Sequence, residues 1–345
     1  MKGKINLLLL VGMLILTGCA SPSSEKGKEA KKRSDKIQIG FTIDSKVLER
    51  WERDVDTFVQ TAEKMGAEVE VLNANSDVQV QIRQIEKFIG EKKDVIVVIA
   101  TDCDRLQLPL QKAKEEGIKV VSYDRLINDV PSDLYISFDN EKVGELMADT
   151  MIRELPEGGK IMMVCGPESD NNAIAVKESF LKQIQNGRLQ VVQMDYAKDW
   201  TPEQAFMAVD EALDNSCDLD GIMCGNDALA TQAICALSQR KMCGDVCVVG
   251  QDADVEACQK IVEGAQTMTV YKPIEEMASK AAEYCVMLAQ DIPLTDVTRT
   301  IKMDGYEIPA VIITPTAVTA ENMDEVIIES GFHDKDDVYM NVSEK

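Results

Sequence analysis

The stretch VCVVGQDADVEACQKIVEGAQTMTVYKP, residues Val246–Pro273, contains the pattern from which the fold can be predicted. It contains an apolar run, a helix whose apolar residues share one face, and a second apolar run. A buried parallel strand is a continuous apolar run, and the helix that follows it covers one face of the sheet. Asp252 and Lys272 follow the two runs directly, so both are expected in the crevice outside the strands' carboxyl ends, where such sheets bind ligands.

The same alternation of apolar runs and one-sided helices extends through most of the chain. A first series covers residues 37–151 and a second series begins at Lys160. Alternation of this kind is typical of parallel sheets joined by right-handed crossovers. Two series of similar length predict an α/β protein with two similar lobes, each a parallel sheet flanked by helices.

Size and charge exclude several kinds of function. The 345 residues are enough for two ordinary domains. The net charge of −23 argues against a nucleic acid partner, which needs a basic surface. His333 is the single histidine and is interpreted as an exposed surface residue, so no histidine-based metal site is expected. We predict neither a metal nor a cofactor.

The N-terminus predicts export and a lipid anchor. Two lysines precede an apolar run at residues 7–16, which is too short to span a bilayer and is typical of a secretory signal. Leu16-Thr17-Gly18-Cys19 resembles the bacterial lipobox, which implies cleavage before Cys19 and lipid attachment to its thiol. Residues 1–18 would then be the signal peptide. Residues 19–35, polar and without apolar periodicity, would be a lipidated tether outside the cell membrane.

The chain has ten cysteines, nine without Cys19, and no CxxC pair. We interpret these nine as small buried hydrophobic residues rather than as metal ligands or redox groups. Whether any of them form disulfides stays open. Several fall in predicted strands (Cys165, Cys224, Cys247) or on apolar helix faces (Cys235, Cys258, Cys285).

Polar and aromatic residues follow nearly every predicted strand. Each one alone is explained as a helix cap or an exposed charge, but all of them converge on the same edge of the predicted sheets. Both tryptophans of the chain belong to this set. Its members are Arg50, Trp51, Asp102, Asp124, Arg125, Asp170, Asn171, Asn172, Asp199, Trp200, Asn226, Asp227, Asp252 and Lys272.

This mixture of side chains suits a neutral polyhydroxylated ring. Carboxylates accept hydrogen bonds from hydroxyls, Arg and Lys donate to them, and Asn does both. Indole faces pack on the C–H faces of such a ring. No GxGxxG or P-loop motif is present to hold phosphate, and no single carboxylate pair stands out for glycoside cleavage. We therefore predict a binding protein rather than an enzyme.

Seven segments, in order along nearly the whole mature chain, carry a resemblance: LERWERD (48–54), VSYDRLIND (121–129), YISFDNEKVGEL (135–146), SDNNA (169–173), GQDAD (250–254), TMTVYKP (267–273) and GFH (331–333). They resemble a known family, the type I periplasmic sugar-binding proteins of ABC importers, and in particular those that bind D-xylose. This resemblance implies two lobes joined by a three-crossing hinge, with the sugar between them. The first lobe would comprise residues 36–139 with 272–308, and the second lobe 140–271 with 309–345.

The resemblance also implies the roles of individual residues and the partners. Trp51 and Trp200 would sandwich the sugar ring, and an ABC permease with its ATPase would receive the sugar. Alternatively, the protein would sense xylose for a membrane histidine kinase, and the sequence does not decide between transport and sensing or give the oligomeric state. The sugar hydroxyls would be held by Arg50, Asp124, Arg125, either Asn171 or Asn172, Asn226, Asp252 and Lys272.

Overall fold

The computed structural model describes residues 36–46, 50–185, 187–215, 218–303 and 305–342. The predicted signal peptide (1–18), the tether (19–35) and the lipidation site Cys19 lie outside the described residues. Within the described ranges, no helix combines the length and the apolar character needed to cross a membrane.

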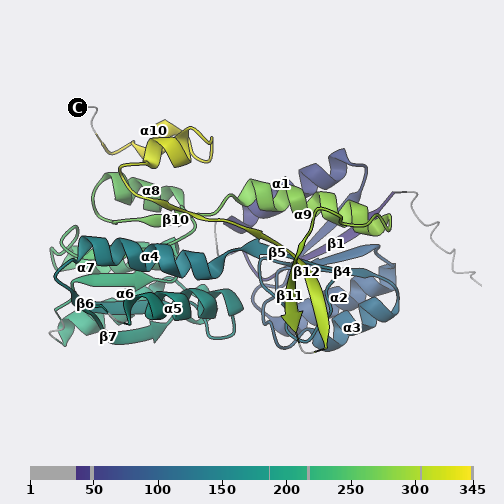
Figure 1. The fold of residues 1–345 in the computed structure, drawn as a ribbon, viewed down its shortest axis with the longest axis horizontal. Helices are drawn as coiled ribbons and strands as arrows, with labels where there is room; N and C mark the ends of the chain where they lie inside the picture. Colours follow the sequence, from purple (N-terminus) through teal and green to yellow (C-terminus); the bar gives the residue numbers. More distant parts are fainter. Residues whose placement is uncertain (1–35, 47–49, 186, 216–217, 304, 343–345) are drawn as a thin grey trace, which may run out of the picture. The chain divides into compact units, whose positions relative to one another are not determined.

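A seven-stranded sheet forms the core of what we call the first lobe (Figure 1). Its strand order is β11-β12-β5-β4-β3-β1-β2, and all neighbours are parallel except the edge pair β11–β12. The strands are β1 (Gln38–Ile43), β2 (Glu68–Asn73), β3 (Val95–Val98), β4 (Lys119–Tyr123), β5 (Leu134–Phe138), β11 (Arg299–Met303) and β12 (Tyr306–Ile313).

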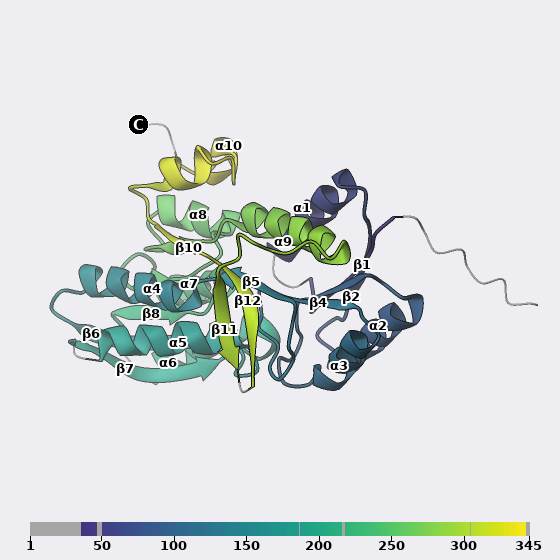
Figure 2. The ribbon, with the colours of Figure 1, turned by 45° about the vertical axis from the view of Figure 1, so that its right-hand side comes forward.

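Helices cover both faces of this sheet because its strands are apolar on both sides. Val95 and Val97 of β3 belong to one core cluster, whereas Ile96 and Val98 belong to another. The helices α1 and α9 pack side by side, as Figures 1 and 2 show. The helices of this lobe are α1 (Arg50–Lys64), α2 (Val78–Glu91), α3 (Gln107–Glu115) and α9 (Ile274–Ala289).

The second lobe is built on a parallel four-stranded sheet of order β7-β6-β8-β9. Its strands are β6 (Gly159–Cys165), β7 (Leu189–Tyr196), β8 (Gly221–Cys224) and β9 (Cys247–Val249), with a separate antiparallel pair β10 (Thr269–Tyr271) and β13 (Thr316–Val318). Its helices are α4 (Asn140–Glu154), α5 (Asn171–Ile184), α6 (Glu203–Asp214), α7 (Asp227–Gln239), α8 (Val255–Val262) and α10 (Lys335–Val338), with a 3₁₀ turn at Lys198–Trp200 and a π-helical turn at Asp324–Ile328. The predicted α/β class with parallel sheets is confirmed.

The chain passes between the two sheets three times, after β5, after β10 and after β12. The lobe boundary predicted at residue 308 is wrong, because it lies inside β12. Pairing of β12 with β5 continues to Ile313, so the strand belongs to the first lobe as a whole. After β12 the chain returns to the second lobe, where α10 packs on α8 (Figure 1).

Two predictions about single residues need correction. His333, predicted to be exposed, is buried with its Nε2 atom 2.7 Å from the carbonyl oxygen of Ala253. The burial predicted for all nine cysteines other than Cys19 is wrong for Cys235 on α7 and for Cys243, which are both exposed. The eight cysteines among the described residues are all free thiols, and six of them are buried.

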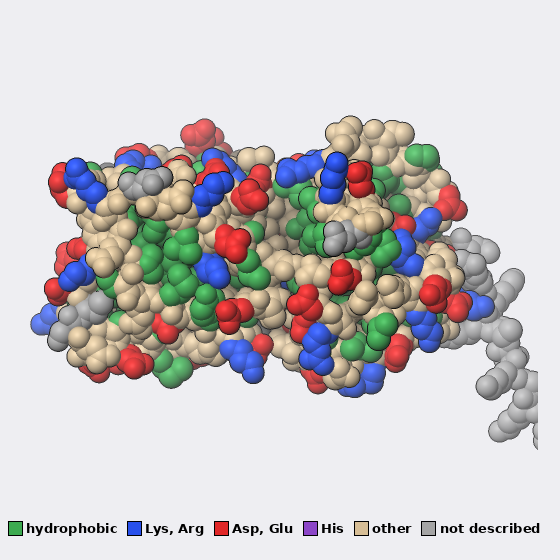
Figure 3. All heavy atoms as spheres, turned by 60° about the horizontal axis from the view of Figure 1, so that its bottom comes forward, with side chains coloured by type: hydrophobic (Ala, Val, Ile, Leu, Met, Phe, Trp, Pro, Cys, Tyr) green, Lys and Arg blue, Asp and Glu red, His purple; other side chains and the backbone are tan. Residues whose placement is uncertain are grey.

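The net negative charge does not gather in one patch on the face drawn in Figure 3. Lys and Arg side chains are interspersed there with Asp and Glu side chains. On this face, therefore, charges of both signs are mixed, although the whole chain carries a net charge of −23.

Two glycines of the first lobe provide a test of its packing. A Cβ atom at Gly40 of β1 would lie 2.6 Å from the ring of Phe88 on α2, whereas a Cβ at Gly90 of α2 meets nothing within 4 Å. Gly40→Ala should therefore destabilise the protein by roughly 1–3 kcal/mol through overpacking. Gly90→Ala should stabilise it by roughly 0.5–1 kcal/mol, because alanine loses less backbone entropy in a helix. Urea unfolding measures both changes, and equal effects would contradict the described helix–sheet contact.

Candidate functional site

A polar pocket lies where residues of both lobes meet. Most of its lining residues follow strand ends, as the sequence pattern predicts. Eight of the predicted site residues are among them, and Asp170 and Gln251 complete the set. The lining residues are Arg50, Trp51, Asp124, Arg125, Asp170, Asn172, Trp200, Gln251, Asp252 and Lys272.

Arg50, the first residue of α1, is shared among carboxylates of both lobes. Its Nη2 atom lies 2.9 Å from Asp124 Oδ1, its Nε atom 3.2 Å from Asp54 Oδ2 and its Nη1 atom 3.8 Å from Asp252 Oδ1. Asp54 also accepts a hydrogen bond from the hydroxyl of Tyr123. Burial raises the pKa of Asp54 to about 6, although Arg50 and Tyr123 act to lower it.

Arg125 is the second cation that joins the lobes. It donates to Asp44 Oδ2 at 2.9 Å and lies 2.8 Å from Asp170 Oδ2 of the second lobe. Asp170 also accepts from the indole N–H of Trp200 at 3.2 Å and from the backbone N–H of Asn172 at 2.9 Å. Asp170 therefore orients Trp200, caps the N-terminus of helix α5 and pairs with Arg125 of the opposite lobe.

Two further contacts complete the set of paired groups. Asn172 Nδ2 donates to Asp124 Oδ2 across the lobes at 2.8 Å, and Lys272 Nζ lies 3.0 Å from Asp252 Oδ1. The space left between the side chains is about 20 Å³, room for about one water. The polar groups of the pocket therefore largely satisfy one another, and a larger ligand must replace these mutual contacts with its own.

The two tryptophans line this same pocket from opposite lobes. The Arg50 guanidinium stacks on the Trp51 ring at 4.3 Å. Trp200 packs closely against two glycines, because a Cβ at Gly166 would come within 2.2 Å of its ring and a Cβ at Gly225 within 3.2 Å. Any side chain at Gly166 would therefore require the indole to shift.

Strained backbone is concentrated here. Three lining residues have positive φ although none is glycine: 62° at Asp124, 56° at Trp200 and 101° at Asp252. Such conformations persist only where the surroundings hold them, and they cluster at functional sites. Four buried polar atoms of the lining have no hydrogen-bond partner among the described residues: Arg50 Nη2, Trp51 Nε1, Gln251 Oε1 and Asp252 Oδ1. The Arg50 and Asp252 atoms are held in ion pairs instead.

Two predicted residues do not line the pocket. Asn171 turns its amide toward the first lobe, where Nδ2 donates to the Leu126 carbonyl at 3.0 Å and to Asn128 Oδ1 at 3.1 Å. Asn226 caps α7, and its Oδ1 accepts the Leu229 N–H at 2.9 Å. For Asn226 the capping explanation, which the sequence also allowed, matches the observed geometry.

Gln251 is the pocket residue that the sequence analysis did not name. It lies directly before Asp252 and follows β9, so position after a strand end is the signal that could have found it. Asp170 was named among the polar residues after strand ends, but no ligand contact was assigned to it.

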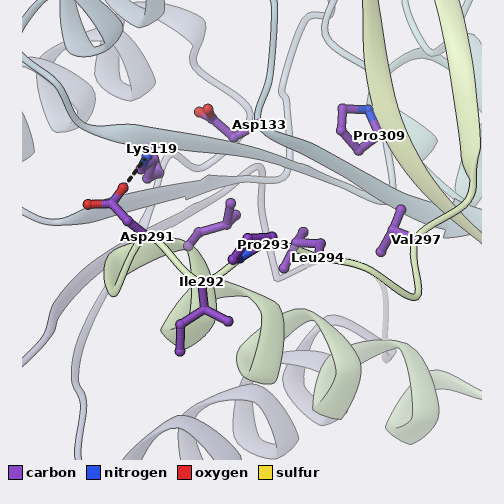
Figure 4. A pocket seen from close by; sticks show the side chains of 9 residues that line it. Lys119, Asp133, Asp291, Ile292, Pro293, Leu294, Val297 and Pro309 are labelled. Carbon is purple, nitrogen blue, oxygen red and sulfur yellow. Dashed lines mark ion pairs between the residues drawn. The ribbon is translucent and has the colours of Figure 1, made fainter.

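A larger cavity of about 320 Å³ lies elsewhere on the first lobe (Figure 4). Most of its lining is apolar, from Leu288 to Val297 and Pro309, with the Lys119–Asp291 ion pair at 2.8 Å. Lys119 begins β4, so this cavity lies at the opposite end of the strands from the polar pocket. We take the polar pocket as the functional site because six buried ionisable groups are costly to maintain without a role.

The chain is similar to known proteins over nearly its whole length. A family model described as periplasmic binding protein domain matches residues 39–292. D-xylose-binding periplasmic proteins of Haemophilus influenzae and Escherichia coli are 40% and 39% identical, over 98% and 96% of this chain and 100% and 98% of those proteins. An ABC transporter solute binding protein from Clostridium phytofermentans, solved with β-D-glucose, matches at a TM-score of 0.79 and 26% identity, over 87% of this chain and 99% of that chain.

Asp227 does not line the pocket, but it holds the second-lobe loop that carries Asp252. Its buried carboxylate accepts from Thr269 Oγ1 at 2.6 Å, from Gln266 Nε2 at 2.9 Å and from the Asp254 N–H at 3.2 Å. Burial nevertheless raises the pKa of Asp227 from its ordinary 3.8 to about 8. The folded protein therefore binds a proton at this carboxylate more tightly than the unfolded chain does.

This shift predicts a pH dependence of stability. Between about pH 4 and pH 8 the folded state holds the Asp227 proton and the unfolded state does not, so stability should fall as the pH rises through that window. Asp227→Asn should flatten the decline, whereas Asp245→Asn, at an exposed position of the same lobe, should leave it unchanged. Urea unfolding at several pH values measures this slope. A parent-like slope in Asp227→Asn would show that Asp227 is ionised in the folded protein.

Proposed function

Because the chain belongs to the periplasmic sugar-binding proteins of ABC importers, we propose that it binds D-xylose in the polar pocket and delivers it to an ABC permease. The names of its two relatives with 40% and 39% identity support xylose as the ligand. Like the family, this protein is a binding protein and not an enzyme.

The balance of charge in the pocket is the observation that carries the proposal. Three cations (Arg50, Arg125, Lys272) stand against three carboxylates (Asp124, Asp170, Asp252) in the lining. A balanced set attracts neither an anion nor a cation, but it offers donors and acceptors to neutral hydroxyls. Trp51 and Trp200 add flat apolar surfaces suited to the C–H faces of a sugar ring.

The cross-lobe contacts suggest how binding would be coupled to lobe closure. Arg125–Asp170, Asp124–Asn172 and Arg50–Asp252 each join one lobe to the other. Sugar hydroxyls inserted among these groups would take over one side of each pair, so that the ligand itself bridges the lobes. A ligand that contacts both lobes binds the closed state more tightly than the open state, and this difference in binding free energy shifts the protein toward the closed state.

We also propose that the protein is attached to the cell membrane through lipid on Cys19. The support is the sequence Leu16-Thr17-Gly18-Cys19 after a short apolar run. A polar tether of residues 19–35 would separate the sugar-binding lobes from the bilayer.

Titration calorimetry against a panel of aldopentoses and aldohexoses tests the ligand. We expect D-xylose to bind with the highest affinity, because a pocket of dedicated polar groups rejects ligands that leave those groups unpaired. Emission from the two tryptophans should change saturably at the same sugar concentrations, since both indoles would contact the ring. Tighter binding of another sugar would replace xylose as the ligand, and no binding of any sugar would refute the pocket's proposed role.

A matched pair of variants locates the site within the same experiment. Asp252→Ala should weaken xylose binding by about 10–100-fold, the effect of losing roughly 1–3 kcal/mol of hydrogen bonding. Asp245→Ala makes the same change at an exposed position of the same lobe and should bind as the parent does. Parent-like affinity in Asp252→Ala would place the sugar elsewhere.

Cys19→Ser tests the anchor. The parent, expressed in a bacterium and labelled with a radioactive fatty acid, should carry label and sediment with membranes, and Cys19→Ser should lose both properties. Cys243→Ser, which removes an exposed thiol of the second lobe, should retain them. Label retained in Cys19→Ser would contradict the lipobox interpretation.

A further inference from the structure

The loop that carries Asp252 has a backbone conformation that needs external support. Asp252 and Ala253 both have positive φ, 101° and 55°, and they are consecutive residues with side chains. The left-handed region is disfavoured for residues with a Cβ atom. Two such residues in succession are retained only where neighbouring groups hold the loop in place.

Three supports of this loop come from the second lobe itself. The Asp252 N–H donates to the Val270 carbonyl at 2.9 Å, and the Ala253 N–H donates to Thr269 Oγ1 at 3.1 Å. The Asp254 N–H donates to Asp227 Oδ2 at 3.2 Å. All three hold backbone N–H groups. From its own lobe the Ala253 carbonyl accepts a hydrogen bond from the Cys258 thiol at 3.6 Å, and a thiol is a weak donor.

A further support, with a stronger donor, comes from near the C-terminus. His333 Nε2 lies 2.7 Å from the Ala253 carbonyl oxygen, in a buried contact between residues 80 positions apart. The carbonyl accepts, so the ring atom that faces it carries the proton. This bond holds the carbonyl of the residue that directly follows Asp252, where the backbone is strained.

The segment that places His333 also contacts the first lobe. The Phe332 ring packs on the His333 ring at 4.5 Å and on the Tyr271 ring at 4.8 Å. Arg53 of α1 donates to the Phe332 carbonyl at 2.7 Å, and its guanidinium stacks on the Phe332 ring at 4.2 Å. Arg53 lies one helical turn after Arg50, so Phe332 and His333 are tied to elements that carry both sides of the pocket.

We infer that His333 is a positioning residue for Asp252. It does not line the polar pocket itself. By holding the Ala253 carbonyl, it keeps the strained loop in the one conformation that aims Asp252 at Lys272 (3.0 Å) and Arg50 (3.8 Å). This inference rests on the proposed function, in which Asp252 accepts a hydrogen bond from the sugar.

A double-mutant cycle tests the inference. His333→Phe keeps a ring but removes the donor, and it should weaken xylose binding about tenfold, the loss of one buried hydrogen bond. His333→Gln, which offers an N–H near the same place, should recover most of the affinity. In the Asp252→Ala background, His333→Phe should cause little further loss, because the group that it positions is absent.

Outcomes of the cycle separate positioning from general support of the fold. If His333→Phe binds xylose as the parent does, the inference is wrong. If its effect is equally large with and without the Asp252 carboxylate, His333 acts on the fold as a whole and the inference is also wrong. Unfolding midpoints of all variants, measured in parallel, show whether affinity and stability change together.

Hydrogen exchange of the protein without added sugar tests the role of His333 independently of the proposed function. The amides of Asp252, Ala253 and Asp254 should exchange faster in His333→Phe, while those of the first-lobe helix α2 should not change. If the parent binds no sugar, the proposed function fails, and exchange still decides whether His333 holds the loop. Unchanged exchange at these three amides would refute the inference whatever the protein binds.

Discussion

The Arg50 guanidinium is the group on which the arrangement of the pocket depends. It is buried, it contacts Asp54 and Asp124 of its own lobe, and it faces Asp252 of the other lobe. A buried cation is tolerated only where carboxylates compensate for its lost hydration. Arg50 therefore requires the loops after β4 and β9 to deliver their carboxylates to one place, and that requirement brings strand ends of two separate sheets together.

The same constraint explains why strain is concentrated around the pocket. Asp124 and Asp252 both have positive φ, and each sits in a loop whose neighbouring backbone groups are bonded to adjacent strands. A relaxed loop would direct these carboxylates elsewhere and leave Arg50 without partners. The strained loops cost stability, but because neighbouring groups hold them, they keep the pocket's donors and acceptors in fixed positions. Discrimination among similar neutral ligands requires such fixed positions. Asp227 and His333 act indirectly, because they hold the loop of Asp252 and do not themselves line the pocket.

The cross-lobe pairs also limit what the pocket can accept. With Arg125 on Asp170 and Asn172 on Asp124, the remaining space is about 20 Å³. A ligand has to offer hydrogen bonds at least as good as those it displaces, and it has to do so toward both lobes. An apolar ligand would separate the cross-lobe pairs and offer no hydrogen bonds in their place, so the apolar cavity near Lys119 and the polar pocket suit different chemistry.

Sequence by itself determined the alternation of strands and helices, the two sheets, and the edge at which polar residues gather, because apolar periodicity and position after a strand are local properties. It could not decide between Asn171 and Asn172, since neighbouring residues at a helix start point in different directions and only the packed loop selects one. From the sequence, Asn226 and Asp170 could each be a helix cap or a pocket residue. In the structure Asn226 is a cap only, whereas Asp170 both caps α5 and lines the pocket. His333 was misjudged because its partner, Ala253, lies 80 residues away. The boundary inside β12 was wrong for the same reason, because pairing between β12 and β5 is a contact between distant segments that no local pattern contains.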